Sequence, residues 1–225
     1  LKSKGDSFKG KTVTISGSGN VAIYAAEKVM QLGGKVVALS DSSGYVHDSE
    51  GVKLDTVKQL KEVEHKCISE YAIIHTNATF TPNLQGIWTI PCDIALPCAT
   101  QNELDFEAAK TLAVNGCKIV GEGANMPCTP DAVEFFLANN IRFCPGKAAN
   151  AGGVATSGLE MVQNSMRLSW IFEEVDAKLQ EIMKNIFTAV DETARKFGQE
   201  NNYVLGANVA GLLRVSDAML AQGVI

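Results

Sequence analysis

Gly17-Ser18-Gly19-Asn20-Val21-Ala22 follows the pattern G-x-G-x-x-A, with alanine in the third small position. A β-branched run, Thr12-Val13-Thr14-Ile15-Ser16, precedes it, and residues 21–32 after it carry helical periodicity. In a strand–turn–helix unit, the first glycine allows a tight turn and the second lets the backbone approach a pyrophosphate. The N–H groups at the start of the helix then receive the anion, assisted by the helix dipole. The stretch therefore predicts a dinucleotide-binding loop, against the alternative of a structural glycine turn.

Strand and helix signals go on alternating after this loop. Further strands are predicted at 35–39, 93–96, 117–121 and 141–143, and further helices at 52–71, 103–115 and 129–139. Such alternation implies right-handed crossovers and a sheet covered on both faces. The predicted fold class is α/β, a Rossmann-type, doubly wound and mostly parallel sheet.

The pattern changes after Gly153. Residues 154–197 show helical signals only, and residues 208–221 form a last amphipathic segment. We therefore predict a dinucleotide-binding Rossmann core over residues 1–150 and a helical C-terminal segment over residues 151–225, which packs on the core.

Composition and charge narrow the classes of partner. The 225 residues are 46% hydrophobic, and the formal net charge is −5, so we expect no nucleic-acid binding. We also expect no membrane contact and no segment of the apolar length of a membrane span. The six cysteines form no CxxC pair, which predicts free, mostly buried thiols and no metal site.

Asp41 follows Gly19 by 22 positions, at the end of the second predicted strand. An acid about 20 residues after the glycine motif is expected to bind the ribose hydroxyls of NAD, and it would repel the 2′-phosphate of NADP. Ser40, Ser42 and Ser43 surround it with hydroxyls, which suit a phosphate. These residues by themselves leave NAD and NADP equally open.

Three later segments carry a resemblance to a known family. They are 94–103 (IALPCATQNE), 121–127 (GEGANMP) and 147–161 (KAANAGGVATSGLEM). Together with the glycine loop, and in this order, they resemble the cofactor domain of hexameric glutamate dehydrogenases, from about Gly10 to Ile225. All three also follow predicted strands, so their polar groups are expected to converge on one cleft.

The resemblance implies a set of cofactor contacts. Gly17, Gly19, Asn20 and Val21 would line the pyrophosphate; Ala99, Thr100 and Asn125 would lie near the nicotinamide-side ribose, and Asn150 near the carboxamide. The two asparagines offer both amide donors and an acceptor, but they could instead cap helices or satisfy turns. The Ser40-Asp41-Ser42-Ser43-Gly44 segment looks like that of NADP-using members, which favours NADP over NAD. Ser42 is the first expected phosphate contact and Ser40 the second.

The resemblance also implies a substrate contact. Ser157 matches the position that hydrogen-bonds the substrate's side-chain carboxylate in the family, and Val154 lies in the same motif. The alternative for Ser157 is a helix N-cap ahead of Leu159.

The activity implied is that of an NADP-dependent glutamate dehydrogenase, which interconverts glutamate with 2-oxoglutarate and ammonia by hydride transfer. The family's catalytic lysines and aspartate lie in an N-terminal substrate domain that has no counterpart here, so no catalytic residue is expected in this chain. We therefore expect a fragment that binds dinucleotide without turnover, comes from a cytoplasmic enzyme, and forms a hexamer only with the missing domain. The alternatives are an NAD-dependent glutamate or other amino-acid dehydrogenase, and a non-catalytic dinucleotide-binding module.

Overall fold

The computed structural model describes residue 1 and residues 5–223. It divides into two compact units, Leu1–Phe143 and Cys144–Ile225. The boundary lies at the end of the last strand, between Phe143 and Cys144, and the residues that follow this strand form helices.

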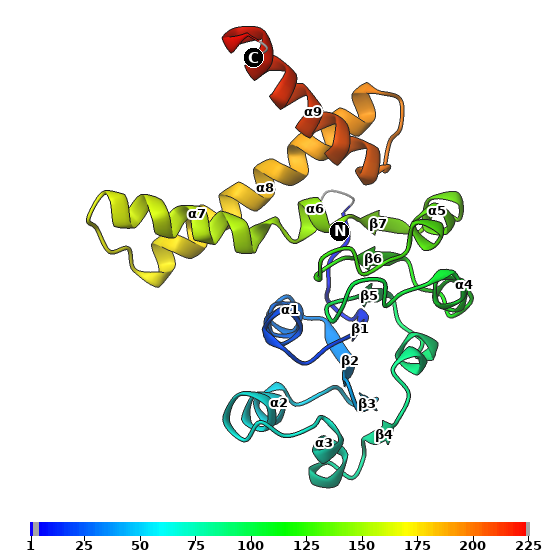
Figure 1. Cartoon of the computed structure of the whole chain (residues 1–225). Coiled ribbons are helices and arrows are strands. Elements are labelled where there is room, and N and C mark those ends of the chain that lie inside the picture. The colour runs from blue at the N-terminus through cyan, green and yellow to red at the C-terminus, as the bar shows by residue number, and fades with distance from the viewer. Residues whose placement is uncertain (2–4, 224–225) are drawn as a thin grey trace. The chain divides into compact units, whose positions relative to one another are not determined.

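The first unit is built on a seven-stranded sheet with the order β4-β3-β2-β1-β5-β6-β7 (Figure 1). β1 pairs in parallel with both β2 and β5, and β5 pairs in parallel with β6. The strands are β1 (Thr12–Ile15), β2 (Lys35–Asp41), β3 (Gly44–His47), β4 (Thr79–Thr81), β5 (Ile94–Leu96), β6 (Ile119–Gly121) and β7 (Arg142–Cys144). The strand order reverses between β1 and β5, and such a switch point is where open α/β sheets bind ligands.

Helices cover both faces of this sheet, which confirms the α/β fold class. α1 (Asn20–Gln31) and α2 (Leu54–Lys58) lie on one face, and α4 (Phe106–Val114) and α5 (Pro130–Ala138) lie on the other (Figure 1). The apolar residues of β1 and β2 are therefore enclosed from both sides, and their side chains form the centre of the core. Among them, Val13, Ile15, Val36 and Leu39 have no exposed surface.

Two antiparallel strands, β3 and β4, extend the sheet beyond β2 and were not predicted. Asp41 pairs with Gly44, so Ser42 and Ser43 form a two-residue hairpin loop. Gly44 has a φ of +149°, and a Cβ there would lie 2.2 Å from the carbonyl oxygen of Thr81. The segment Asp41–Gly44, which the sequence suggested as a phosphate turn, is therefore also a hairpin turn of the sheet.

The single helix predicted over 52–71 is wrong, because it is broken into three pieces. They are α2, the π-helical turn η2 (Gln59–Val63) and α3 (Ser69–Ile74). His65 adopts a left-handed conformation with φ of 54°, which a continuing helix does not allow. The apolar spacing of this segment looks continuous in sequence because each piece buries its own apolar residues, such as Val57, Leu60 and Tyr71.

After Cys144, which ends β7, the described residues of the second unit form helices and the turns that connect them, in agreement with the predicted helical C-terminal segment. Its helices are α6 (Gly146–Ala149), α7 (Ala151–Ser165), α8 (Phe172–Lys196) and α9 (Tyr203–Gln222). The long helices α8 and α9 pack against each other at Gly206, where a Cβ would lie 2.3 Å from the carbonyl oxygen of Val190. Phe187 and Tyr203 add an edge-to-face aromatic contact at 5.7 Å between ring centroids.

α9 corrects one expectation from the sequence. The helix is long and apolar enough, by length and composition, to cross a membrane, although no such segment was expected. The small residues Gly206, Ala207 and Ala210 make its apolar character less conspicuous in the sequence than a run of large side chains would. Length and composition do not by themselves make a helix a membrane span, since core helices of other proteins share them.

Candidate functional site

The glycine loop connects the end of β1 to the start of α1. Gly17 has a φ of +88°, and a Cβ there would lie 3.1 Å from the carbonyl oxygen of Cys98. The Oγ of Ser16 accepts a hydrogen bond of 2.8 Å from the N–H of Cys98, which ties the loop to the end of β5. Only glycine fits at position 17, both for its backbone conformation and for its closeness to β5.

The N-terminus of α1 provides the electrostatics of an anion site. Gly19 is the N-cap, no side chain caps it, and the first turn contains no acidic residue. The first N–H groups of a helix have no acceptor within the helix, and the helix dipole gives this end a partial positive charge. A Cβ on Gly19 would meet no heavy atom within 4 Å. Ala22 is completely buried, as the small third position of the motif requires.

A cavity of about 520 Å³ opens beside this helix terminus. It lies at the carboxyl ends of β1, β2 and β5, which is the switch point of the sheet. Its lining residues are Gly17, Ser18, Gly19, Asn20, Val21, Ile23, Asp41, Lys61, Glu62, Cys98 and Ala99. The cavity thus brings together the predicted pyrophosphate loop, the predicted ribose acid and the first of the predicted nicotinamide-side residues.

Asp41 enters the cavity from the end of β2, with its carboxylate held by four donors. The N–H and the hydroxyl of Ser43 donate to Oδ1 at 2.8 and 2.6 Å. The Nζ of Lys61 and the N–H of Ile68 donate to Oδ2 at 2.9 and 2.7 Å. Burial by itself raises the pKa of Asp41, but the hydrogen bonds from Ser43, Ile68 and Lys61 outweigh it and hold the pKa below its ordinary value. The carboxylate is therefore ionised and fixed in place.

The two serines predicted as phosphate contacts lie in different environments. Ser40 is 3% exposed, and its Oγ accepts a hydrogen bond of 2.8 Å from the N–H of Gly17, so it supports the glycine loop from behind. Ser42 is exposed at the tip of the hairpin loop, next to Asp41. Of the two hydroxyls, that of Ser42 is the one open to a ligand.

The loop after β5 carries Ala99 and Thr100, both exposed. Their N–H groups donate to Oε1 of Glu103, at 2.9 and 3.3 Å. Burial raises the pKa of Glu103, although these two N–H groups lower it in part. No role was predicted for Glu103. It lies in the 94–103 block, four residues after Ala99, and its carboxylate holds the loop by accepting these two hydrogen bonds.

The loop after β6 packs directly against the loop after β5. A Cβ on Gly123 would lie 2.4 Å from the Sγ of Cys98 and 3.2 Å from a methyl carbon of Val21. The N–H groups of Gly123 and Ala124 both donate to the carbonyl oxygen of Pro97. Burial raises the pKa of the Cys98 thiol to about 12, so this cysteine is a packing residue.

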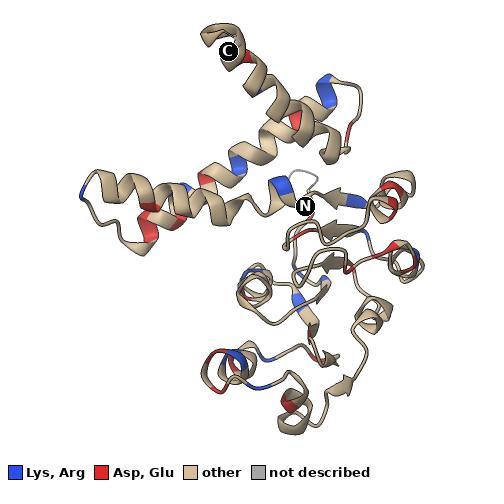
Figure 2. Cartoon of the chain, viewed as in Figure 1, with Lys and Arg blue, Asp and Glu red and all other residues tan. Residues whose placement is uncertain are grey.

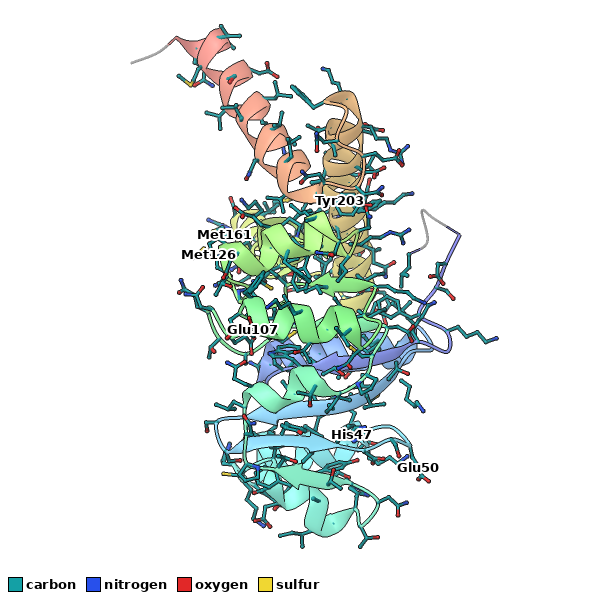
Figure 3. All side chains as sticks on the ribbon, turned by 90° about the vertical axis from the view of Figure 1, so that its right-hand side faces the viewer. His47, Glu50, Glu107, Met126, Met161 and Tyr203 are labelled. Carbon is teal, nitrogen blue, oxygen red and sulfur yellow. The ribbon has the colours of Figure 1, made fainter. Side chains whose placement is uncertain are left out.

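Asn125 and Met126 lie at the exposed tip of the loop after β6. Met126 adopts a left-handed conformation with φ of 49° and is 63% exposed. Figure 3 shows Met126 on the side of the sheet where the parallel strands end, and His47 and Glu50 on the opposite side. The loops after β5 and β6 therefore lie together at the carboxyl edge of the sheet. Of the predicted residues Ala99, Thr100 and Asn125, only Ala99 is among those that line the cavity.

The remaining predicted residues belong to the second unit. Asn150 ends α6 and begins α7, and its side chain makes no capping hydrogen bond there. Val154 and Ser157 are exposed on α7. The alternative interpretation of Ser157 as a helix N-cap is wrong, because α7 begins at Ala151 and Ser157 lies within it.

The cysteines are free, as the absence of CxxC pairs predicted. Cys92, Cys98, Cys117 and Cys128 are buried, Cys144 is half-buried and Cys67 is exposed. Within residues 1 and 5–223, no three metal-ligating side chains gather in one place.

The family of glutamate/leucine/phenylalanine/valine dehydrogenases matches residues 1–223. The chain belongs to this family. Its relatives include the NADP-specific glutamate dehydrogenases of Helicobacter pylori (50% identical over 230 residues) and Haemophilus influenzae (54% over 228 residues). Each match covers 100% of this chain and 51% and 50% of the relative, respectively. The chain thus spans about half the length of the curated relatives it matches.

A solved dehydrogenase structure of the family shares the same architecture. The glutamate dehydrogenase of Plasmodium falciparum superimposes with a TM-score of 0.95 at 47% identity, over 100% of this chain and 49% of that one. This agreement supports the resemblance that the four sequence blocks indicated, and it shows the Rossmann-like fold independently of them.

Two residues of the cavity wall, Lys61 and Glu62, were missed by sequence reasoning. Both lie in η2, which follows α2 without a break. The amphipathic spacing of 52–71 identified only the buried positions, so the polar residues between them looked like a solvated helix face. The π-helical turn that places them beside Asp41 has no recognisable signal in a single sequence.

Proposed function

We propose that this chain is the cofactor-binding half of an NADP-dependent glutamate dehydrogenase. In the whole enzyme, glutamate would lose a hydride from its α-carbon to the nicotinamide, and hydrolysis of the resulting imine would yield 2-oxoglutarate and ammonia. The cofactor supplies the redox chemistry, and the protein binds and orients it.

The observation that carries the proposal is the cavity at the switch point of the sheet. Its wall contains the N-terminus of α1, which no side chain caps. Gly17 and Gly19 lie in this wall, and because they have no side chains a ligand can approach the backbone there. Backbone N–H groups without a helical acceptor suit the oxygens of a pyrophosphate. The residues present thus fit a dinucleotide, and the 50–54% identity to NADP-specific relatives favours NADP.

The residues of the first unit would divide the cofactor between them. Gly17, Gly19, Asn20 and Val21 would hold the pyrophosphate, while Asp41 and Ser42 would lie at the adenine-side ribose. Ala99, Thr100 and Asn125 would hold the nicotinamide-side ribose, with Glu103 fixing the first two. In the second unit, Asn150 would reach the carboxamide, and Val154 and Ser157 would contact glutamate.

One relative leaves a second cofactor open. A relative from Xylanibacter ruminicola, 51% identical, is named an NAD(P)-specific glutamate dehydrogenase, so NAD stays the second candidate cofactor.

The exposed apolar residues of α9, among them Leu212, Val215 and Leu220, would pack against the remainder of the longer protein. We expect that protein to be a cytoplasmic hexamer, with its catalytic residues outside this chain.

Titration of this polypeptide with NADPH and with NADH, followed by nicotinamide fluorescence, tests the cofactor. We expect clearly tighter binding of NADPH, and loss of binding for both in Gly19→Val, whose side chain would enter the open space beside the helix terminus. Unchanged binding in Gly19→Val would remove the glycine loop from the site, and tighter binding of NADH would make NAD the cofactor.

The substrate is tested in the longer protein that carries this chain. Glutamate-dependent reduction of NADP is expected, and Ser157→Ala should raise KM for glutamate about tenfold with less effect on KM for NADP. Equal activity with leucine or valine would contradict glutamate as the substrate.

A further inference from the structure

We propose that Lys61 is the cation that selects the 2′-phosphate of NADP, and that Asp41 positions this lysine instead of binding the ribose. The inference rests on the proposed function, because it assigns a specificity-determining residue to the same cofactor site.

The carboxylate of Asp41 already has a protein donor at each position where it can accept a hydrogen bond. A carboxylate has about four positions at which it can accept a hydrogen bond. Ser43 occupies two of them, and Lys61 and Ile68 occupy the other two, all at 2.6–2.9 Å. Asp41 therefore has no position left for a ribose hydroxyl. The rule that an acid at the end of the second strand selects NAD fails here, because this acid faces protein donors.

The ammonium group of Lys61 has two protein acceptors. It donates to Asp41 at 2.9 Å and to the carbonyl oxygen of Lys66 at 2.9 Å. An ammonium group has three donors, and the third of Lys61 has no protein acceptor among the residues that the structure describes. Its side chain is 22% exposed, and the residue lines the cavity next to Asp41. The group is thus anchored from two sides and still able to donate to a ligand.

A π-helical turn of the backbone brings Lys61 to the cavity. The N–H of Glu64 donates to the carbonyl oxygen of Gln59, a hydrogen bond of the π-helical type. The wider turn lets Leu60 stay buried, with 1% of its surface exposed, while the next two residues line the cavity. Lys58, one turn earlier, points elsewhere and pairs with Glu27.

The charged side chains around the cavity differ in how far they can act on a ligand. Figure 2 shows basic and acidic residues close together around α2 and the turn that follows it. Of the three charged side chains of the cavity wall, Asp41 is bound by its donors and Glu62 is exposed to water, which screens it. Lys61 supplies the positive charge of the wall, and Ser42, the residue after Asp41, offers an exposed hydroxyl. This pair suits a phosphate attached to the ribose at the end of β2.

The test uses two ligands that differ only in the 2′-phosphate, adenosine 2′,5′-bisphosphate and adenosine 5′-monophosphate. Wild type and Lys61→Gln are titrated with each ligand, and with NADPH and NADH, by calorimetry or fluorescence. Glutamine keeps a donor for Asp41 and removes the charge. We expect affinity for the bisphosphate and for NADPH to fall about tenfold or more, and affinity for the monophosphate and for NADH to change less than twofold.

Three further variants complete the design. Lys61→Arg should restore most of the bisphosphate preference, because it keeps the charge. Lys58→Met is the matched control, an ion-paired lysine one turn away that does not line the cavity, and it should leave the preference unchanged. If Lys61→Gln does not fold, Asp41→Asn/Lys61→Gln replaces it, since this pair leaves no unpaired carboxylate.

The outcomes separate this inference from the proposed function. A bisphosphate preference that persists in Lys61→Gln would overturn the role of Lys61 while leaving the site in place. Equal losses for all four ligands would make Lys61 a structural residue only. A wild-type chain that binds none of the four would overturn the proposed function and this inference with it.

Discussion

The hydroxyl of Ser40 accepts a hydrogen bond of 2.8 Å from the N–H of Gly17, and both groups are buried. The N–H of Ser40 donates in return to the carbonyl oxygen of Gly17. β2 thus fixes the conformation of the glycine loop from behind, before any ligand binds. The loop's shape depends on a residue that does not itself need to contact the cofactor.

Replacing Ser40 by alanine should therefore destabilise the fold. The N–H of Gly17 would lose its acceptor in a buried place, which costs about 1–3 kcal/mol. Urea unfolding of Ser40→Ala should show this loss, together with weaker binding of both NADPH and NADH. Ser42→Ala is the matched control: Ser42 is exposed, so its stability should stay within about 0.5 kcal/mol of wild type. Equal stability of the two variants would refute the supporting role of Ser40.

Gly123 should tolerate no side chain. A Cβ there would lie 2.4 Å from the Sγ of Cys98, so Gly123→Ala is expected to lower the free energy of unfolding by about 1–3 kcal/mol. Cys98→Ala in the same chain should recover part of the loss by removing the sulfur. Gly211→Ala serves as the control, because its Cβ would meet no atom within 4 Å inside α9. Failure of Cys98→Ala to relieve the defect would mean that the strain lies in the backbone.

The hydrogen-bonded carboxylate of Asp41 predicts a dependence of stability on pH. Its pKa is lowered in the folded chain, so its contribution is fully present above the unfolded value of about 3.9 and is lost as the pH falls through the folded value. Asp41→Asn should be less stable than wild type at pH 7 by about 1–3 kcal/mol. The difference in Tm between the two should shrink as the pH falls below about 4. A difference that stays constant from pH 7 to pH 3 would argue against an ionised, hydrogen-bonded Asp41.

The cysteines should differ sharply in reactivity with a thiol reagent. Cys67 is exposed, whereas Cys92, Cys98, Cys117 and Cys128 are buried. Since the thiolate is the reactive form, burial that raises the pKa of Cys98 to about 12 also slows its reaction. Native protein should show one fast thiol, and denatured protein all six. Cys67→Ser should remove the fast phase; a fast phase that survives this change would place another cysteine at the surface.

Much of the first unit followed from local sequence patterns. The glycine motif with its β-branched run predicted β1, the loop and α1, because a tight turn, a close approach and a small packing residue each require particular residues at fixed spacing. The buried strands β2 and β5 and the helices α4 and α5 followed from apolar runs and periodicity. The four blocks resembling glutamate dehydrogenases indicated the family, to which the chain belongs.

Other features depend on contacts between segments that are far apart in the sequence. β3 and β4 are short, and their pairing is decided by the hairpin at Ser42 and by the packing of Gly44 against Thr81. The break of the 52–71 segment places Lys61 next to Asp41, twenty residues away, although the apolar spacing suggested one helix. Hydrophobic periodicity reports which residues are buried, but not where the chain bends between them.

The sequence by itself determined the family, the Rossmann-like fold and the position of the dinucleotide loop, because these rest on residues whose conformational demands are local. Only the tertiary structure decided what Asp41 does. Whether a carboxylate is open to a ribose hydroxyl depends on which donors surround it, and those donors come from the hairpin, the π-helical turn and the start of α3. Hydrogen bonds between such distant segments form only when the chain has folded.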